Sequence, residues 1–194
     1  MLLDEPFGSL DASLREGLRE DVARILKDTA ATTILVTHDQ SEALAFADHV
    51  AVLDQGRIVA YAEPRELYLD PPHLAAAMSI GDTNLIEARI EAGRAICMLG
   101  PVEVKLHADA GGDGPCRLLL RPEQLVLHPQ PTPAGTHAVV VELQYHGHDA
   151  LAHVKLDDPA AGMLRARIPG HLATAAGDDV WIEVTGVANA WRID

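Results

Sequence analysis

Two adjacent carboxylates near the start of the sequence are the residues best suited to chemistry. Asp4 and Glu5 end a short apolar run that begins at Leu2. At a strand end, one carboxylate can hold a magnesium-bound water, and its neighbour can polarise a water that attacks a phosphate. An acidic pair in this position also serves as a helix cap or a solvated turn, so the pair alone leaves both interpretations open.

The elements that follow are expected to bring a histidine to the same place. Apolar spacing predicts an amphipathic helix over Ala12–Asp28 with Asp11 as its N-cap, and the run from Thr32 to Val36 predicts a strand that ends before His38. In such a strand–helix–strand unit the crossover is right-handed and the strands are parallel. The acidic pair and His38 are therefore expected at one sheet edge, where His38 can contact a terminal phosphate, although a histidine there also serves as a cap.

These residues resemble the ATP-binding subunits of ABC transporters. Leu2–Ala12 is similar to the Walker B strand and D-loop of that family, and Ile34–Glu42 is similar to its switch-histidine segment. The resemblance continues through residues 47–59, which by themselves predict two strands around a Gln-Gly turn, and through residues 63–68. It covers roughly residues 1–80 without a gap.

The resemblance implies roles for four side chains. It implies that Asp4 contributes to magnesium coordination, that Glu5 is the catalytic base, and that His38 senses the γ-phosphate. It places Asp11 at the contact between two nucleotide-binding domains, a role compatible with capping the helix. The cofactors implied for the parent protein are ATP and Mg²⁺.

The sequence departs from the family in the parts that hold phosphate. It contains no G-x-x-x-x-G-K-[ST] phosphate loop, and its Gly111-Gly112 pair falls in a turn-like segment. It also contains no LSGGQ-like signature and no glutamine loop, so backbone amides and a lysine would not neutralise a triphosphate. We therefore expect these 194 residues alone to hold no cofactor and not to hydrolyse ATP.

The composition favours a soluble, cytosol-facing chain. No apolar run approaches the roughly 18 residues of a membrane span, and no basic and apolar signal segment opens the sequence. The net charge of −14, from 15 basic and 29 acidic residues, argues against nucleic-acid binding. Cys97 and Cys116 are too few for a disulfide framework and are expected to be reduced thiols.

A change of pattern near Ser79–Asp82 predicts two domains, 1–80 and 81–194. The first is mixed α/β and is expected to end in helices over Pro64–Leu69 and His73–Met78. The second is expected to be all-β, most simply a small barrel. Its predicted strands cover residues 85–90, 95–99, 102–106, 116–120, 125–127, 138–143, 150–156, 164–168 and 180–184.

The all-β region resembles the TOBE-type regulatory domain that follows the ATPase domain in importers of the iron(III), polyamine and maltose types. Leu120–Leu125 and Val141–His148 carry this resemblance, which implies an OB-like barrel that dimerises or binds regulators without catalytic residues of its own. Arg121 and Glu123 can form a structural ion pair there or contact a ligand. The fold class expected for the whole chain is an α/β remnant of a P-loop ATPase domain followed by this barrel.

Three histidines of the all-β region raise the question of a metal site. His146 and His148 are two residues apart, and His153 lies on the next predicted strand. Zinc, nickel or iron could be bound by such a set, but the cysteine or acidic partners of strong ligand spacings are missing. Solvated imidazoles are the simpler expectation.

Two functions remain open from the sequence. One is the C-terminal part of the ATP-hydrolysing subunit of an ABC importer, located at the inner face of the membrane, with a membrane permease and a second ATPase subunit as partners. In that case the first domain should leave the apolar faces of residues 2–3, 34–36 and 50–53 uncovered, and the barrel should self-associate. The other is a stand-alone barrel that binds a small oxyanion, a metal or a regulatory protein.

Overall fold

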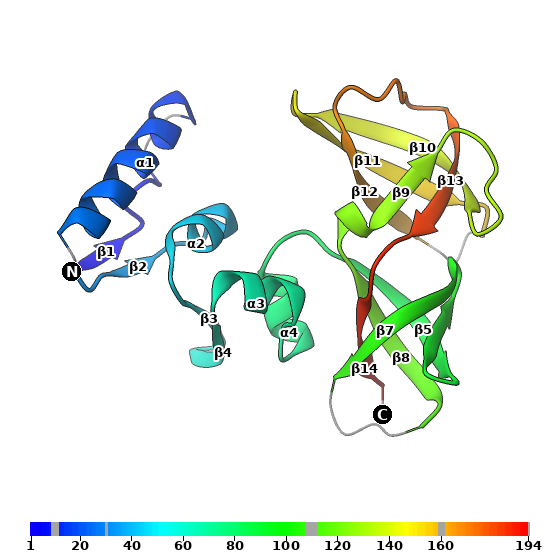
Figure 1. Cartoon of the computed structure of the whole chain (residues 1–194), viewed down its shortest axis with the longest axis horizontal. Coiled ribbons are helices and arrows are strands. Elements are labelled where there is room, and N and C mark those ends of the chain that lie inside the picture. The colour runs from blue at the N-terminus through cyan, green and yellow to red at the C-terminus, as the bar shows by residue number, and fades with distance from the viewer. Residues whose placement is uncertain (9–11, 30, 108–111, 159–161, 194) are drawn as a thin grey trace. The chain divides into compact units, whose positions relative to one another are not determined.

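The chain folds into two compact units, Met1–Gly81 and Asp82–Asp194, in a computed structural model (Figure 1). The structure describes residues 1–194 except 9–11, 30, 108–111, 159–161 and 194, and on the first helix it does not describe the side chains of residues 12–16, 19, 20 and 27. Among the described residues, no helix is long and apolar enough to cross a membrane.

The first unit is mixed α/β and begins with two parallel strands joined through a helix. The register of these strands sets Leu2 opposite Ile34 and Asp4 opposite Val36, so the predicted strand–helix–strand order is present. The elements are β1 (Leu2–Asp4), α1 (Ala12–Asp28), β2 (Ile34–Val36), α2 (Gln40–Phe46), β3 (Val50–Asp54), β4 (Arg57–Ala62), α3 (Pro64–Leu69) and α4 (Leu74–Ser79).

A separate hairpin, β3 and β4, carries the core of this unit. Its turn is made by Gln55 and Gly56, both at positive φ (46° and 76°), as the Gln-Gly turn predicted. Residues from the hairpin, α3 and α4 share one buried cluster, which consists of Val50, Val52, Ala60, Leu67, Ala76 and Ile80. The expectation that residues 50–53 would be uncovered is therefore wrong for Val50 and Val52, because the two short helices bury that face.

The second unit is built from strands and one short 3₁₀ turn. Its elements are β5 (Asn84–Glu91), β6 (Arg94–Cys97), β7 (Gly100–His107), β8 (Gly114–Leu120), η1 (Pro122–Gln124), β9 (Leu125–His128), β10 (Thr136–Tyr145), β11 (Asp149–Leu156), β12 (Met163–Pro169), β13 (Asp179–Val184) and β14 (Ala188–Arg192). Strands β5 and β12 alternate buried and more exposed residues over most of their length, which is the pattern that predicted strands in this region, whereas β14 is buried at four of its five positions.

These strands form a closed barrel and a five-stranded sheet. The barrel order is β14-β7-β6-β5-β8, and the sheet order is β12-β11-β10-β13-β9, with its end strands β9 and β12 in contact. The last strand, β14, returns to the barrel and pairs parallel to β7 and antiparallel to β8. The expectation of one small barrel is thus incomplete, because alternation identifies strands but not their pairing. One apolar core runs through both parts.

Candidate functional site

Glu5 extends the parallel pair by one hydrogen bond at its carboxyl end. The Glu5 N–H donates to the Val36 carbonyl at 2.9 Å, directly after the Asp4–Val36 pair of the ladder. Glu5 then turns the chain, with φ at 46°, a left-handed conformation that few residues other than glycine adopt. The backbone thus stops the strand at Glu5 and fixes the start of its side chain.

Glu5 and His38 meet at this edge. The His38 Nδ1 lies 2.7 Å from the Glu5 Oε1, although the residues are 33 positions apart in the chain. Both side chains are accessible, His38 at 81% and Glu5 at 41%. The hydrogen bond to Glu5, followed by the charge of the same carboxylate, raises the pKa of His38 above its usual value. The structure therefore brings together the carboxylate of Glu5 and the histidine that the sequence singled out.

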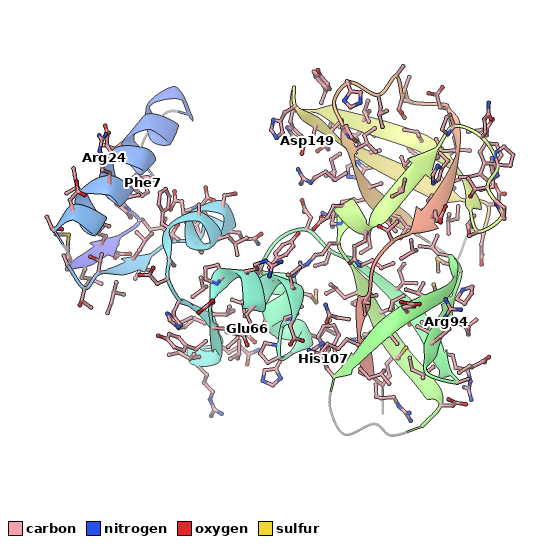
Figure 2. The ribbon with its side chains drawn as sticks, in the orientation of Figure 1. Phe7, Arg24, Glu66, Arg94, His107 and Asp149 are labelled. Atoms are coloured by element: carbon pink, nitrogen blue, oxygen red, sulfur yellow. The ribbon has the colours of Figure 1, made fainter. Side chains whose placement is uncertain are left out.

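An aromatic contact anchors the segment that follows Glu5. Phe7 is only 3% exposed and stacks on Phe46 of α2, with ring centroids 6.1 Å apart (Figure 2). The Gly8 N–H donates back to the Glu5 carbonyl at 3.2 Å, which closes a tight turn. Burial of Phe7 holds this turn in place, so Glu5 is positioned from both sides.

Polar contacts around Thr37 hold His38 from its own segment. The Thr37 hydroxyl donates to the Glu42 carboxylate at 2.6 Å and accepts from the Asp39 N–H at 3.0 Å. Asp39 caps α2, since its Oδ1 accepts from the N–H groups of Ser41 at 2.8 Å and Glu42 at 3.2 Å. His38 therefore lies between two residues fixed to the start of α2.

Three positioning residues escaped the sequence reasoning. They are Phe7, Thr37 and Glu42, the last buried to 4% exposure. A signal was available for one of them, because Asp39 and Glu42 have the spacing of a helix capping box. In the structure Glu42 accepts from the Thr37 hydroxyl, and the same hydroxyl accepts from the Asp39 N–H. Thr37 therefore links Glu42 to the backbone of the N-cap residue.

The remaining predicted site residues are placed less fully. Asp4 is exposed at the end of β1, one residue from Glu5 and opposite Val36. Carboxylate oxygens are the ligands that Mg²⁺ prefers, so Asp4 fits a water-mediated contact to that ion. Asp11 lies outside the described residues. The edge can thus supply a carboxylate for a hard cation and a carboxylate–imidazole pair for proton transfer.

Arginine and aspartate side chains form a network around Asp82, the first residue of the second unit. Arg165 and Arg167 of β12 contact the Asp82 carboxylate at 2.9 and 3.5 Å, and Arg167 also binds Asp149 at 2.6 Å. The Arg167 hydrogen bond lowers the pKa of Asp149, which Figure 2 labels. Arg121 is 4% exposed and donates to the Asp82 carbonyl at 3.3 Å. Its pairing with Glu123 stays a prediction.

Two of the three histidines suggested for metal binding lie near acidic side chains. His153 lies 3.4 Å from Glu142 on the neighbouring strand, and His148 lies 3.7 Å from Asp149. The part of the chain that the structure describes contains no cluster of three histidine, cysteine or acidic side chains arranged to hold a metal ion. The acidic partner of His153 thus comes from the adjacent strand, which sequence spacing did not reveal, whereas the partner of His148 is the next residue in the chain.

Comparison with known proteins identifies the family of both units. The TOBE domain model matches residues 118–186. The chain is 44% identical to the Fe(3+) ions import ATP-binding protein FbpC 2 of Rhodococcus jostii (strain RHA1), over 100% of the chain and 55% of that protein. It is 43% identical to the FbpC protein of Pseudomonas fluorescens (strain Pf0-1), over 98% of the chain and 55% of that protein. The chain spans about half the length of these relatives.

A solved structure is also similar at low level. The cytoplasmic molybdate-binding protein ModG shares 11% identity, with a TM-score of 0.39 over 53% of this chain and 89% of that chain. This likeness is too distant to support an argument about fold or ligand. The family assignment rests on the two FbpC relatives and the TOBE match.

Proposed function

Since this chain belongs to the ATP-binding subunits of ABC importers and corresponds to their C-terminal part, we propose that its first unit supplies the hydrolytic edge of the nucleotide site. The observation that supports this most directly is the 2.7 Å contact between Glu5 and His38 at the end of the parallel strands. Ligands of α/β sheets bind at this edge, which is the correct place for groups that act on a phosphate.

Glu5 is the general base in this proposal. A carboxylate has two oxygens, so one can orient His38 while the other accepts a proton from the attacking water. His38 contacts the γ-phosphate, and its raised pKa favours the cationic form that an anionic phosphate attracts. Asp4 holds Mg²⁺ through water, and that ion when bound offsets the charge of the phosphates. Asp11 contributes to the contact with a second ATPase subunit.

The other components of the site come from the part of the relatives that this chain does not match. Without a phosphate loop in its 194 residues, the chain alone is inactive and holds no nucleotide. The assembled protein has a membrane permease and a second ATPase subunit as partners and works at the cytoplasmic face of the membrane. The names of the 43–44% identical relatives favour Fe(3+) as the imported ion.

The second unit is proposed to regulate and dimerise the subunit. A TOBE match over residues 118–186 and a closed apolar core support a self-contained domain, which is what a regulatory appendage requires. Its largest fully buried side chains are mostly leucine, isoleucine and valine, which pack inward to form that core. Regulation is therefore assigned to this unit and hydrolysis to the first.

A chimera tests the proposed function. The segment of the Rhodococcus jostii relative that precedes the matched region is joined in frame to Met1, and ATP hydrolysis is measured. We expect Glu5→Gln to lower kcat about 10²- to 10⁴-fold while ATP still binds, because only proton transfer is lost. His38→Ala should lower kcat by a similar factor.

The control for these variants is Glu66→Gln, which makes the same chemical change on the exposed side of α3 (Figure 2). It should hydrolyse ATP at the rate of the parent chimera. If Glu5→Gln keeps its activity within about threefold of the parent, Glu5 is a structural residue and the proposed base is wrong.

A further inference from the structure

His137 bridges two carboxylates that come from different parts of the five-stranded sheet. Its Nδ1 lies 2.8 Å from an Asp157 oxygen, and its Nε2 lies 3.1 Å from an Asp179 oxygen. Trp181, directly opposite on β13, packs against the imidazole with ring centroids 5.3 Å apart. Both ring nitrogens are thus engaged by anions while an aromatic side chain restricts the ring.

Only the cationic form of histidine satisfies this arrangement. A neutral imidazole carries one N–H and one lone pair, so it can donate to one carboxylate while its lone pair faces the other. Imidazolium donates from both nitrogens and places a positive charge between two negative ones. The described geometry therefore selects protonated His137.

The bridge joins three strands. His137 lies on β10, Asp179 begins β13, and Asp157 follows β11 at the position that continues the pairing of Ala138 with Leu156. The backbone ladder continues past Asp179, since the Val140 N–H donates to the Asp178 carbonyl at 2.9 Å. Protonation at one ring therefore acts on both neighbours of the central strand.

Acid–base contacts of this kind recur across the sheet. Among the described residues, each pair of adjacent strands has at least one, and three of the four named next use an imidazole. In sheet order they are Arg167–Asp149 at 2.6 Å, His153–Glu142 at 3.4 Å, His137–Asp179 at 3.1 Å and His128–Glu183 at 3.3 Å. Histidine is the side chain whose charge changes near neutral pH, so the charge of the bridge at His137 depends on pH.

We propose that His137 is a protonation-controlled clamp, which tightens the five-stranded sheet of the TOBE-type unit as the pH falls through the neutral range. The groups that face it are Asp157 after β11 and Asp179 on β13, and the register places Lys155 of β11 opposite the nearby Val139. The inference concerns regulation by the second unit and does not depend on the nucleotide site.

The direction of the pH effect follows from the two carboxylates. Their hydrogen bonds, from Asp157 first and then from Asp179, raise the pKa of His137 above its usual value of about 6.5. A histidine with a raised folded-state pKa contributes its full stabilisation below the unfolded value, and that contribution is lost as the pH rises through the folded value. The sheet is therefore tightest in mildly acidic solution.

NMR titration of the imidazole in the 194-residue chain measures the clamp directly. His137 should titrate at a higher pH in the native chain than in the same chain unfolded in urea. Asp157→Asn and Asp179→Asn should each move the native midpoint down, and the double variant should move it further. Equal native and unfolded midpoints would overturn the proposal, as would a midpoint that neither variant changes.

Thermal melts give a second readout in case a variant alters the fold. Raising the pH from 6 to 8.5 should lower the Tm of the natural sequence, and His137→Gln should make that drop smaller while staying folded. The control is His171→Gln, at an exposed histidine, which should keep the drop. If His137→Gln and the natural sequence show the same pH dependence, the clamp is refuted.

Discussion

The two units hold their polar residues in opposite ways. At the edge of the first unit, Glu5 and His38 project from a two-stranded sheet in which Leu2 and Ile34 are 69% and 63% exposed. In the second unit, Leu118, Leu119 and Leu120 of β8 are completely buried, and the histidine and arginine contacts lie on the strands of the five-stranded sheet. The site of the first unit is therefore fixed by local hydrogen bonds and one aromatic contact, whereas the second unit is fixed by its core.

The largest expected effect comes from a charge in the last strand of the barrel. Ala190 is fully buried where β14 pairs with both β7 and β8. Ala190→Asp places a carboxylate in the core, where no cation is positioned to pair with it among the residues of β7 and β8 opposite Ala190. We therefore expect the free energy of unfolding to fall by more than about 4 kcal/mol and the second unit to show no cooperative melt. Urea unfolding followed by circular dichroism measures this loss.

The matched control for this variant is Val187→Asp, just before β14, where the side chain is 55% exposed. It should change the free energy of unfolding by no more than about 0.5 kcal/mol. A cooperative and stable Ala190→Asp chain would show that β14 is dispensable to the barrel.

Leucine-to-alanine substitutions test how much buried and exposed leucines contribute to stability in the two units. Leu118→Ala, in the core, should cost about 2–5 kcal/mol, because it removes buried methyl groups and leaves a cavity. The same change at Leu2, which is 69% exposed, should cost little. Urea unfolding of both variants tests the contrast. Equal costs would mean that the exposed face of β1 is covered in solution.

A smaller effect is expected at the helix cap beside His38. Asp39→Ala removes the acceptor of two α2 N–H groups and should cost the first unit about 0.5–2 kcal/mol. Asp39→Asn retains a capping oxygen and should cost less. Hydrogen exchange of the α2 amides distinguishes the two, and identical protection in both variants would remove Asp39 from the positioning network.

The smallest expected change is in the proton affinity of His38. Glu5→Gln removes the carboxylate that raises the pKa of His38, so the histidine should titrate at lower pH, while Glu66→Gln should leave it unchanged. Any stability that the pair gives is present at low pH and is lost as the pH rises through the raised pKa. NMR titration measures the shift, and an unchanged His38 would mean that the 2.7 Å contact does not persist in solution.

The local elements were predictable from the sequence, and their pairing was not. The helix over Ala12–Asp28 and the hairpin around Gln55 and Gly56 have clear local signals, namely apolar spacing and a turn dipeptide. Strand β14 escaped prediction because Ala188–Arg192 is short and alanine-rich, and its burial depends on partners about 70–84 residues away.

The candidate site was predictable to the same extent. Glu5 and His38 could be placed together because parallel strands end at one edge, and the structure brings them into contact. Thr37 and Phe7 could not be assigned, since their roles depend on α2, for which no helix was predicted. The acidic partners of His137 and His153 likewise come from neighbouring strands whose register the sequence does not specify.

Calorimetry of the 194-residue chain with Mg-ATP tests most directly the claim that the first unit carries half of a nucleotide site. In the proposed function, Glu5, His38 and Asp4 act on the terminal phosphate and do not replace a phosphate loop. We predict a Kd weaker than about 100 μM, which corresponds to roughly −5.5 kcal/mol. Tighter binding would contradict the claim, because the described edge would then suffice to hold the nucleotide.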